Sequence, residues 1–260
     1  MTDRITDPAA AHAADKDIKT SWTRARLIEP STSGFVHIGA GSGAWRTPVV
    51  LPRGRRRRIL AAMHVAAAEL LGDPRVTRAD VFEAFIRPPG RRSHGPGQDV
   101  PDADFDAVLL VETVDVHGAE EVLRAATVTR LQAELDRTAR RSLVFAGSNA
   151  RRIDRVDHER QGVFLFNYFS ADDVDTNLYA WQYTAGWFQD ETGLDNSTVL
   201  RPAESGKAPY SLVNHCRWDR MSDVMPSLVF KPSFRKFVLR TFTENRVAAR
   251  PIFYRLHRAN

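Results

Sequence analysis

The stretch SLVNHCRWDRMSDV, residues 211–224, predicts a β-strand that runs directly into a helix. Successive side chains of a strand point to opposite faces. Asn214, Cys216 and Trp218 therefore share one face, and His215 lies on the other. An amide on a face that should be buried is unusual, because it costs free energy unless it is hydrogen-bonded. Asn214 is therefore either satisfied by the backbone or available to a ligand.

Outward from this stretch, the hydrophobic pattern predicts the element order β-α-β-β-α-β twice along the chain. In the first half we expect strands at 34–38, 80–87, 105–116 and 142–145, with helices at 55–71 and 119–135. In the second half we expect strands at 162–169, 194–201, 211–218 and 245–256, with helices at 172–191 and, with an interruption, 221–240.

The two halves also show weak internal similarity. The paired stretches are LLVETVDVHGAEEV (109–122) with SLVNHCRWDRMSDV, and GFVHIG (34–39) with GVFLFN (162–167). This alignment puts Glu112 and Val116 at the positions of Asn214 and Trp218. The repeated order predicts tandem ferredoxin-like repeats of the α+β class. Two such sheets, packed by the faces that their helices leave bare, would form a body like a dimeric α+β barrel within one chain.

The domain organisation follows from this repeat. We expect a flexible N-terminal arm at 1–30, an N-terminal ferredoxin-like domain at 31–157 and a C-terminal one at 158–260. The first thirty residues contain no apolar signal-peptide core, and no apolar run approaches the length of a membrane span. A single cysteine excludes an internal disulfide framework and is typical of the cytoplasm, where we expect the protein to be.

Nucleic acid and metal are both unfavourable as partners. The net charge is +5 and the pI is near 9.6, but the basic excess is spread over the chain apart from four arginines at 55–58. No zinc-finger spacing or RNA-binding aromatic signature accompanies it, so we exclude nucleic acid as the main partner. The sequence also has no HExxH, cysteine cluster or paired histidine spacing, so we expect no bound metal.

The C-terminal half resembles a known superfamily. The features that match are FNYF (166–169), Trp181, Gly193 and VNHCRW (213–218). On these it is similar to the antibiotic biosynthesis monooxygenases, which are dimeric α+β barrels. In the anthrone oxygenases of that superfamily, the matching strand supplies an Asn and a Trp to the active site, so the resemblance implies catalytic roles for Asn214 and Trp218. The tyrosine that follows in those enzymes falls on Val224, which cannot donate a proton.

As a two-domain chain with one such motif, the protein resembles the angucyclinone ring-opening oxygenases of the jadomycin, kinamycin and gilvocarcin pathways. The resemblance implies oxidative C–C cleavage of a polycyclic aromatic phenol or hydroquinone by O2, without metal. It also implies reduced flavin (FADH2 or FMNH2) as a dissociable cosubstrate, a flavin reductase as one partner, and a homodimer as one oligomeric option.

The remaining site residues come from the expected strands and helices. His215 is a candidate base, although strand alternation points it away from Asn214. The expected substrate-binding residues are Asn167, Trp181, Phe188 and Cys216, each of which core packing would also explain.

Three alternatives stay open at this stage: a cofactor-independent anthrone-type monooxygenase, a non-oxidative polyketide cyclase, and a barrel that binds a hydrophobic ligand without catalysis.

Overall fold

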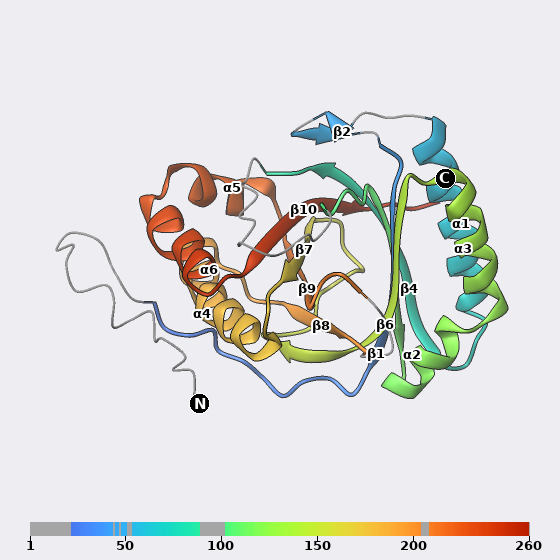
Figure 1. Cartoon of the computed structure of the whole chain (residues 1–260), viewed down its shortest axis with the longest axis horizontal. Helices are drawn as coiled ribbons and strands as arrows, with labels where there is room; N and C mark the ends of the chain where they lie inside the picture. The colour runs from blue at the N-terminus through green and yellow to red at the C-terminus, as the bar shows by residue number, and fades with distance from the viewer. Residues whose placement is uncertain are drawn as a thin grey trace.

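Eight of the ten strands close into an antiparallel barrel (Figure 1). Around the barrel they run β10-β7-β9-β8-β6-β1-β5-β4, and β4 pairs with β10 to close the ring. Their bounds are β1 Gly34–Gly41, β4 Val76–Ile86, β5 Ala107–Thr113, β6 Arg141–Arg152, β7 Val163–Ser170, β8 Thr198–Pro202, β9 Leu212–Trp218 and β10 Ala248–Leu256. Two short strands, β2 (Trp45–Arg46) and β3 (Val49–Val50), extend the sheet beyond β4.

The structure is a computed structural model that describes residues 22–43, 45–46, 48–50, 54–88, 102–203 and 208–259. Its helices form two groups on opposite sides of the barrel (Figure 1). The first group is α1 (Gly54–Leu70), α2 (Val116–Leu123) and α3 (Ala126–Thr138). The second is α4 (Val174–Thr192), α5 (Met221–Phe230), the π-helical segment η1 (Phe234–Leu239) and α6 (Arg240–Glu244).

The α+β class and the barrel are confirmed, but the sheets do not join as we expected. If the four strands of each half are numbered in chain order, they lie side by side in the order fourth, first, third, second. This order is β6-β1-β5-β4 in the first half and β10-β7-β9-β8 in the second. We expected two separate sheets packed face to face. Instead β6 pairs with β8 and β4 pairs with β10, so the strands form one closed sheet. Closure leaves no exposed edge among these eight strands, whereas two separate sheets would have left four.

Three hydrophobic layers follow from this closure. One lies between the sheet and α1–α3, and includes Ile38 and Val111. The second fills the barrel and is rich in aromatic rings, such as Phe166 and Tyr254. The third lies between β7, β9 and the helices α4–α6, and we call it the C-terminal layer; Trp218 belongs to it.

The sequence alignment of the two halves is wrong, because it pairs residues that lie on opposite faces of the sheet. Glu112 alternates with Val108 and Leu110, which point into the barrel, whereas Asn214 points toward α4–α6. Val116, which the alignment matched to Trp218, is the first residue of α2. A shift of one residue exchanges the two faces of a strand, and a weak sequence similarity cannot fix register to one residue.

The expected arm is also wrong in part. Residues 22–30 lie within the described structure and pack over α4, while 1–21 fall outside the described residues. Trp22 is 4% exposed and its ring lies 4.6 Å from that of Phe237, and the Ala25 amide donates to the Gln182 carbonyl at 3.0 Å. Burying the Trp22 indole stabilises the packed segment, although the polar composition around it predicted a flexible arm.

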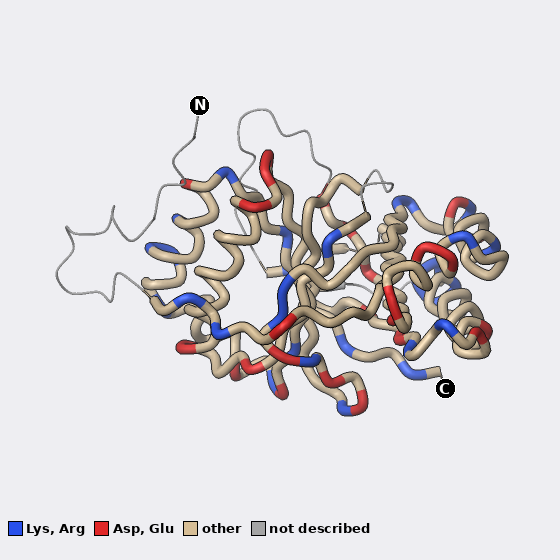
Figure 2. The backbone as a smooth tube through the Cα atoms, turned by 90° about the horizontal axis from the view of Figure 1, so that it is seen from below, with Lys and Arg blue, Asp and Glu red and all other residues tan. Residues whose placement is uncertain are grey.

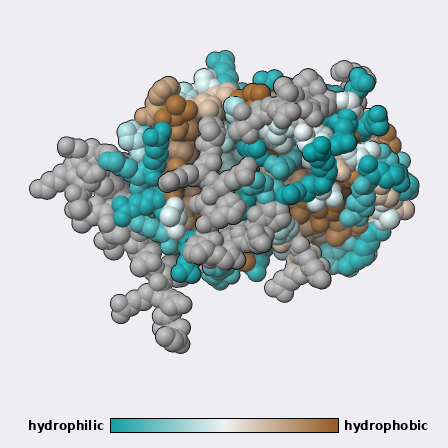
Figure 3. Space-filling view, turned by 45° about the horizontal axis from the view of Figure 1, so that its top comes forward, coloured by the Kyte–Doolittle hydropathy of each residue, from teal (hydrophilic) through white to brown (hydrophobic). Residues whose placement is uncertain are grey.

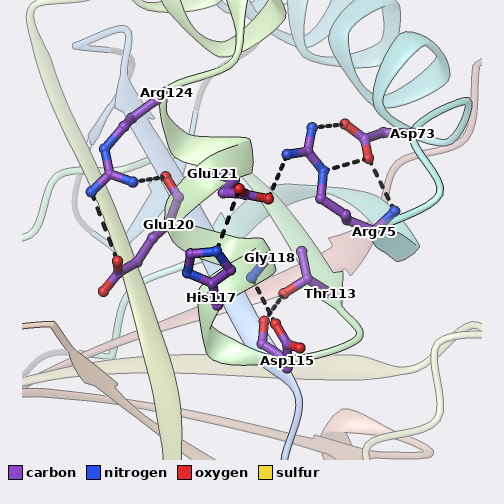
Figure 4. A network of polar contacts seen from close by, with 9 residues as sticks. All are labelled: Asp73, Arg75, Thr113, Asp115, His117, Gly118, Glu120, Glu121 and Arg124. Carbon is purple, nitrogen blue, oxygen red and sulfur yellow. Dashed lines mark hydrogen bonds and ion pairs between the residues drawn. The ribbon is translucent and has the colours of Figure 1, made fainter.

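The helix ends show how local sequence sets the elements. Asp173 caps α4 by accepting from the Thr176 amide, and Gly193 ends it with a left-handed φ of 66°, close to the predicted limits. The single helix expected at 119–135 is two helices. Asp115 begins α2 by accepting from the Gly118 amide, in the network of Figure 4 where Arg75 bridges Asp73 and Glu121.

The surface is mixed in charge, with acidic and basic residues interspersed along the tube of Figure 2. Its exposed hydrophobic side chains include Val229 and Phe230 of α5, and Figure 3 shows hydrophobic surface on the side of the molecule where α5 lies. Within the described residues, no helix combines the length and the apolar composition that crossing a bilayer requires. The expected loop at 88–101 lies almost wholly outside the described part of the chain.

Candidate functional site

Two asparagines face each other across the strand pair that carries the C-terminal layer. Asn167 of β7 is the direct register partner of Asn214 of β9. Residues that are directly opposite in an antiparallel pair point to the same face. Both amides therefore lie on the face that carries Cys216 and Trp218 and is covered by α4. The sequence predicted all four as site residues, and the structure brings them together.

The hydrogen bonds orient one amide and leave the other incomplete. The Ser197 hydroxyl donates to Asn214 Oδ1 at 2.5 Å, so the Asn214 NH2 group points away from Ser197. That NH2 group donates to the Cys216 sulfur at 3.7 Å, and sulfur accepts weakly. Asn167 Oδ1 is buried and has no hydrogen-bond partner. A ligand hydroxyl could donate to Asn167 Oδ1 and accept from Asn214 Nδ2.

Aromatic rings form the wall of this layer. Trp218 donates from Nε1 to Thr192 Oγ1 at 3.0 Å, which fixes the indole, and its ring lies 6.2 Å from that of Phe188. Phe188 in turn contacts Phe234, in the π-helical segment η1. Trp181 is 3% exposed in the same layer. π-Helical turns occur often at functional sites, and this one covers the predicted residues.

His215 is not part of this arrangement. It lies on the opposite face of β9, inside the barrel, and its ring stacks on Phe166 at 4.2 Å. Its Nδ1 lies 3.2 Å from the Leu165 carbonyl oxygen. The structure thus confirms the strand alternation that separated His215 from Asn214 in the sequence, and the role of His215 as a base stays a prediction.

Two further positions limit the chemistry of the layer. Burial raises the pKa of the Cys216 thiol far above its usual value, so this sulfur is a neutral packing group and a weak acceptor. Val224, where the resembling enzymes have a tyrosine, is fully buried in the same layer and offers no proton. Tyr183, on α4, is a tyrosine that is buried in the same layer.

Within the residues that the structure describes, the N-terminal half has no polar face of this kind on β1 and β5. The corresponding face of β1 and β5 carries aliphatic side chains, among them Val36, Ile38, Leu109 and Val111, packed on α1–α3. Ser197, which orients Asn214, escaped the sequence analysis because it comes from the segment before β8 and is adjacent only in three dimensions.

Among the described residues, no group of three or more His, Cys, Asp or Glu side chains is placed to hold a metal ion. The buried titratable and charged side chains of the described residues also lie outside the C-terminal layer. His37 and His215 point into the barrel, and Arg217 lies on the same face of β9 as His215. Arg56 and Asp106 belong to the first half of the chain. The layer is therefore apolar except for its amides and hydroxyls.

Comparison with solved structures agrees with this architecture. No family model matches the chain, and no curated protein matches it. A structure described as an anthrone oxidase-like protein aligns with a TM-score of 0.63 and 11% identity, over 90% of this chain and 94% of that chain. A monooxygenase candidate from Fusobacterium nucleatum subsp. nucleatum aligns with a TM-score of 0.51 and 8% identity, over 88% of this chain and 94% of that one. At such identity the likeness shows a shared fold.

Proposed function

We propose that this protein is an oxygenase of electron-rich polycyclic aromatic compounds and that its active site is the C-terminal layer around Asn167 and Asn214. The observation that carries the proposal is the unsatisfied Oδ1 atom of Asn167, directly opposite Asn214. A buried carbonyl oxygen without a partner costs about 1–3 kcal/mol, so its retention on a face lined by aromatic rings is best explained by a ligand that completes it.

A phenol or hydroquinone fits the polar atoms of this face. Its hydroxyl donates to Asn167 Oδ1, and its oxygen accepts from Asn214 Nδ2, which stabilises negative charge as the phenol loses its proton. Trp218 and Phe188 offer flat surfaces to the ring system. The electron-rich substrate passes an electron to O2, and the superoxide formed accepts the proton that the phenol gives up, while the closed layer keeps water from the radical pair.

Two oxygenase reactions account for both oxygen atoms of O2 and for all the electrons. In an anthrone-type reaction, one oxygen atom of O2 enters the ring as a carbonyl and the other leaves as water. In ring opening, the outcome that the sequence resemblance favours, two electrons from reduced flavin (FADH2 or FMNH2) reduce the second oxygen atom to water. We place flavin as a dissociable cosubstrate supplied by a flavin reductase, because no buried cation of the described residues faces the layer to hold its phosphate.

The finer parts of this proposal are the substrate class and the setting. We propose an angucyclinone-type polyketide as substrate, antibiotic biosynthesis as the context, an N-terminal domain at 31–157 that supports the catalytic domain at 158–260, and a homodimer as one option for assembly. A non-oxidative cyclase and a non-catalytic ligand-binding barrel are the alternatives from other classes.

The test is oxygen uptake with a polyphenolic anthrone and with an angucyclinone hydroquinone, each with and without a flavin-reducing system. The proposal expects O2 consumption and incorporation of one labelled oxygen atom from 18O2 into product. Product formed without O2 would identify the cyclase, and tight binding without any product would identify the ligand-binding barrel. Either result contradicts the proposal.

A further inference from the structure

A second group of polar residues lies at one mouth of the barrel, on the face of β9 opposite to Asn214. His158, in the segment that links β6 to β7, places Nδ1 at 2.7 Å from Asp80 Oδ2 on β4 and Nε2 at 2.8 Å from His215 Nε2 on β9. The His158 imidazole thus connects β4 of the first half to β9 of the second half.

The hydrogen bonds determine where the protons are. His215 Nδ1 faces the Leu165 carbonyl, which only accepts, so this nitrogen carries a hydrogen. A neutral His215 then has a lone pair on Nε2, and His158 must donate to it from Nε2 while donating to Asp80 from Nδ1. His158 is therefore an imidazolium paired with the Asp80 carboxylate. Burial, and then the charge of His158, hold the pKa of His215 well below its usual value, in agreement with this assignment.

A cavity of about 60 Å³ opens beside this pair. A water molecule needs roughly 10–15 Å³ of such space, so the cavity has room for a ligand of several heavy atoms. One part of its lining is polar and basic, with Arg78, Arg152 and Arg155 beside His158 and His215. Another part is apolar and includes Leu110, Val156 and Leu200.

The charge that lines the cavity is positive overall, with Arg78, Arg152, Arg155 and His158 against Glu112. Three further carboxylates, those of Asp80, Asp154 and Glu159, contact lining residues without lining the cavity themselves. Glu159, which pairs with Arg78, is 82% exposed and well screened. His158 and His215 are 7% and 2% exposed, so the charge of the pair acts in a poorly hydrated setting.

We propose that this barrel mouth is a second ligand site, which binds a short-chain carboxylate. The carboxylate group lies beside Arg155 and the His158 imidazolium, and the hydrocarbon chain lies against Leu110 and Leu200. The guanidinium groups donate the hydrogen bonds, and the imidazolium, whose two N–H groups are already engaged, supplies charge. An inorganic anion would satisfy the arginines and leave the apolar wall against water.

The test measures the affinity of the full chain for sodium butyrate and for inorganic phosphate by ligand-observed NMR. We expect butyrate to bind more tightly than phosphate. His158→Gln should weaken butyrate binding by roughly tenfold, because it removes a charge from a buried setting. Arg155→Gln, at an exposed position where folding is safe, should weaken it in the same direction. Arg160→Gln is the matched control: it removes an equal charge from the same segment, outside the cavity.

Histidine 15N spectra give an independent readout of the charge. At neutral pH, His158 should carry hydrogen on both ring nitrogens and His215 on Nδ1 alone. The proposal is overturned if His158 is neutral, if butyrate does not bind or binds no better than phosphate, or if butyrate binding is the same in Arg155→Gln as in Arg160→Gln. None of these results bears on the Asn167–Asn214 site, which lies on the other face of the sheet.

Discussion

At the scale of single residues, the proposed site depends on one atom of the C-terminal layer. Asn167 Oδ1 is buried beside Asn214 without a partner, whereas the amide of Asn196 both donates to the Arg217 carbonyl and accepts from the Arg217 backbone N–H. Such an atom lowers the stability of the free protein. Residues that lower stability and still persist are expected at functional sites.

The first prediction follows from that cost. Asn167→Leu keeps nearly the same volume and removes the unsatisfied oxygen, so the free energy of unfolding should rise by about 1–2 kcal/mol while oxygenase turnover falls. Urea denaturation and oxygen uptake on the same preparation check both effects. Asn196→Leu is the control: it removes an amide that is fully bonded, and it should destabilise. If Asn167→Leu is destabilised and fully active, Asn167 is a structural amide.

At the scale of elements, the segment at 22–30 is the part of the structure that the sequence least indicated. Its contact with α4 depends on a glycine. A Cβ built on Gly186 would lie 1.9 Å from the Thr23 carbonyl oxygen, so the segment can approach the helix only because position 186 has no side chain. The segment covers one end of the layer through Trp22 and Phe237.

Gly186→Ala should therefore displace this segment, although alanine favours a helix in isolation. We expect a lower melting temperature and faster amide exchange at Ala25, whose hydrogen bond to Gln182 would be lost. Gly54→Ala, at the start of α1, is the matched control, because a Cβ there meets no atom within 4 Å. Equal stability of the two variants would show that the segment does not depend on close approach.

At the scale of the whole molecule, the closed barrel encloses groups that must stay uncharged. His37 is completely buried, stacks on Phe145 and contacts the Tyr168 hydroxyl, and burial lowers its pKa from 6.5 to about 3. Between these two values the unfolded chain binds a proton that the folded chain does not. Stability therefore falls as the pH falls from 6.5 toward 3, by roughly 1.4 kcal/mol per pH unit from this residue.

His37→Phe should flatten this acid dependence. Between pH 7 and pH 5 the wild type should lose roughly 2 kcal/mol more than the variant, whatever their difference at pH 7. Urea denaturation at the two pH values measures this double difference. His215 is also buried in the barrel and adds to the acid dependence of both proteins. Its contribution therefore cancels in the difference between wild type and variant. Equal slopes would mean that His37 reaches solvent or stays protonated in the folded state.

The sequence predicted the parts of this molecule that depend on local signals. Strand alternation separated Asn214 from His215, and Asp173 and Gly193 indicated the ends of α4. It did not predict the hydrogen bonds that join the halves, the burial of Trp22 or the Ser197 contact, since each depends on residues far apart in the chain. Register also escaped it, because a slip of one residue leaves a weak alignment almost unchanged and exchanges the faces.

The central claim is that turnover occurs on the helix side of β9 and not inside the barrel, and the two faces can be compared directly. The decisive measurement is the rate of O2-dependent product formation by Asn214→Ala and Glu112→Gln under identical conditions. Asn214→Ala removes a donor that stabilises developing negative charge and should lower turnover by roughly 10²-fold or more. Glu112→Gln, at the barrel mouth, should change it little. A fully active Asn214→Ala together with an inactive, folded Glu112→Gln would contradict the account and move the active site into the barrel.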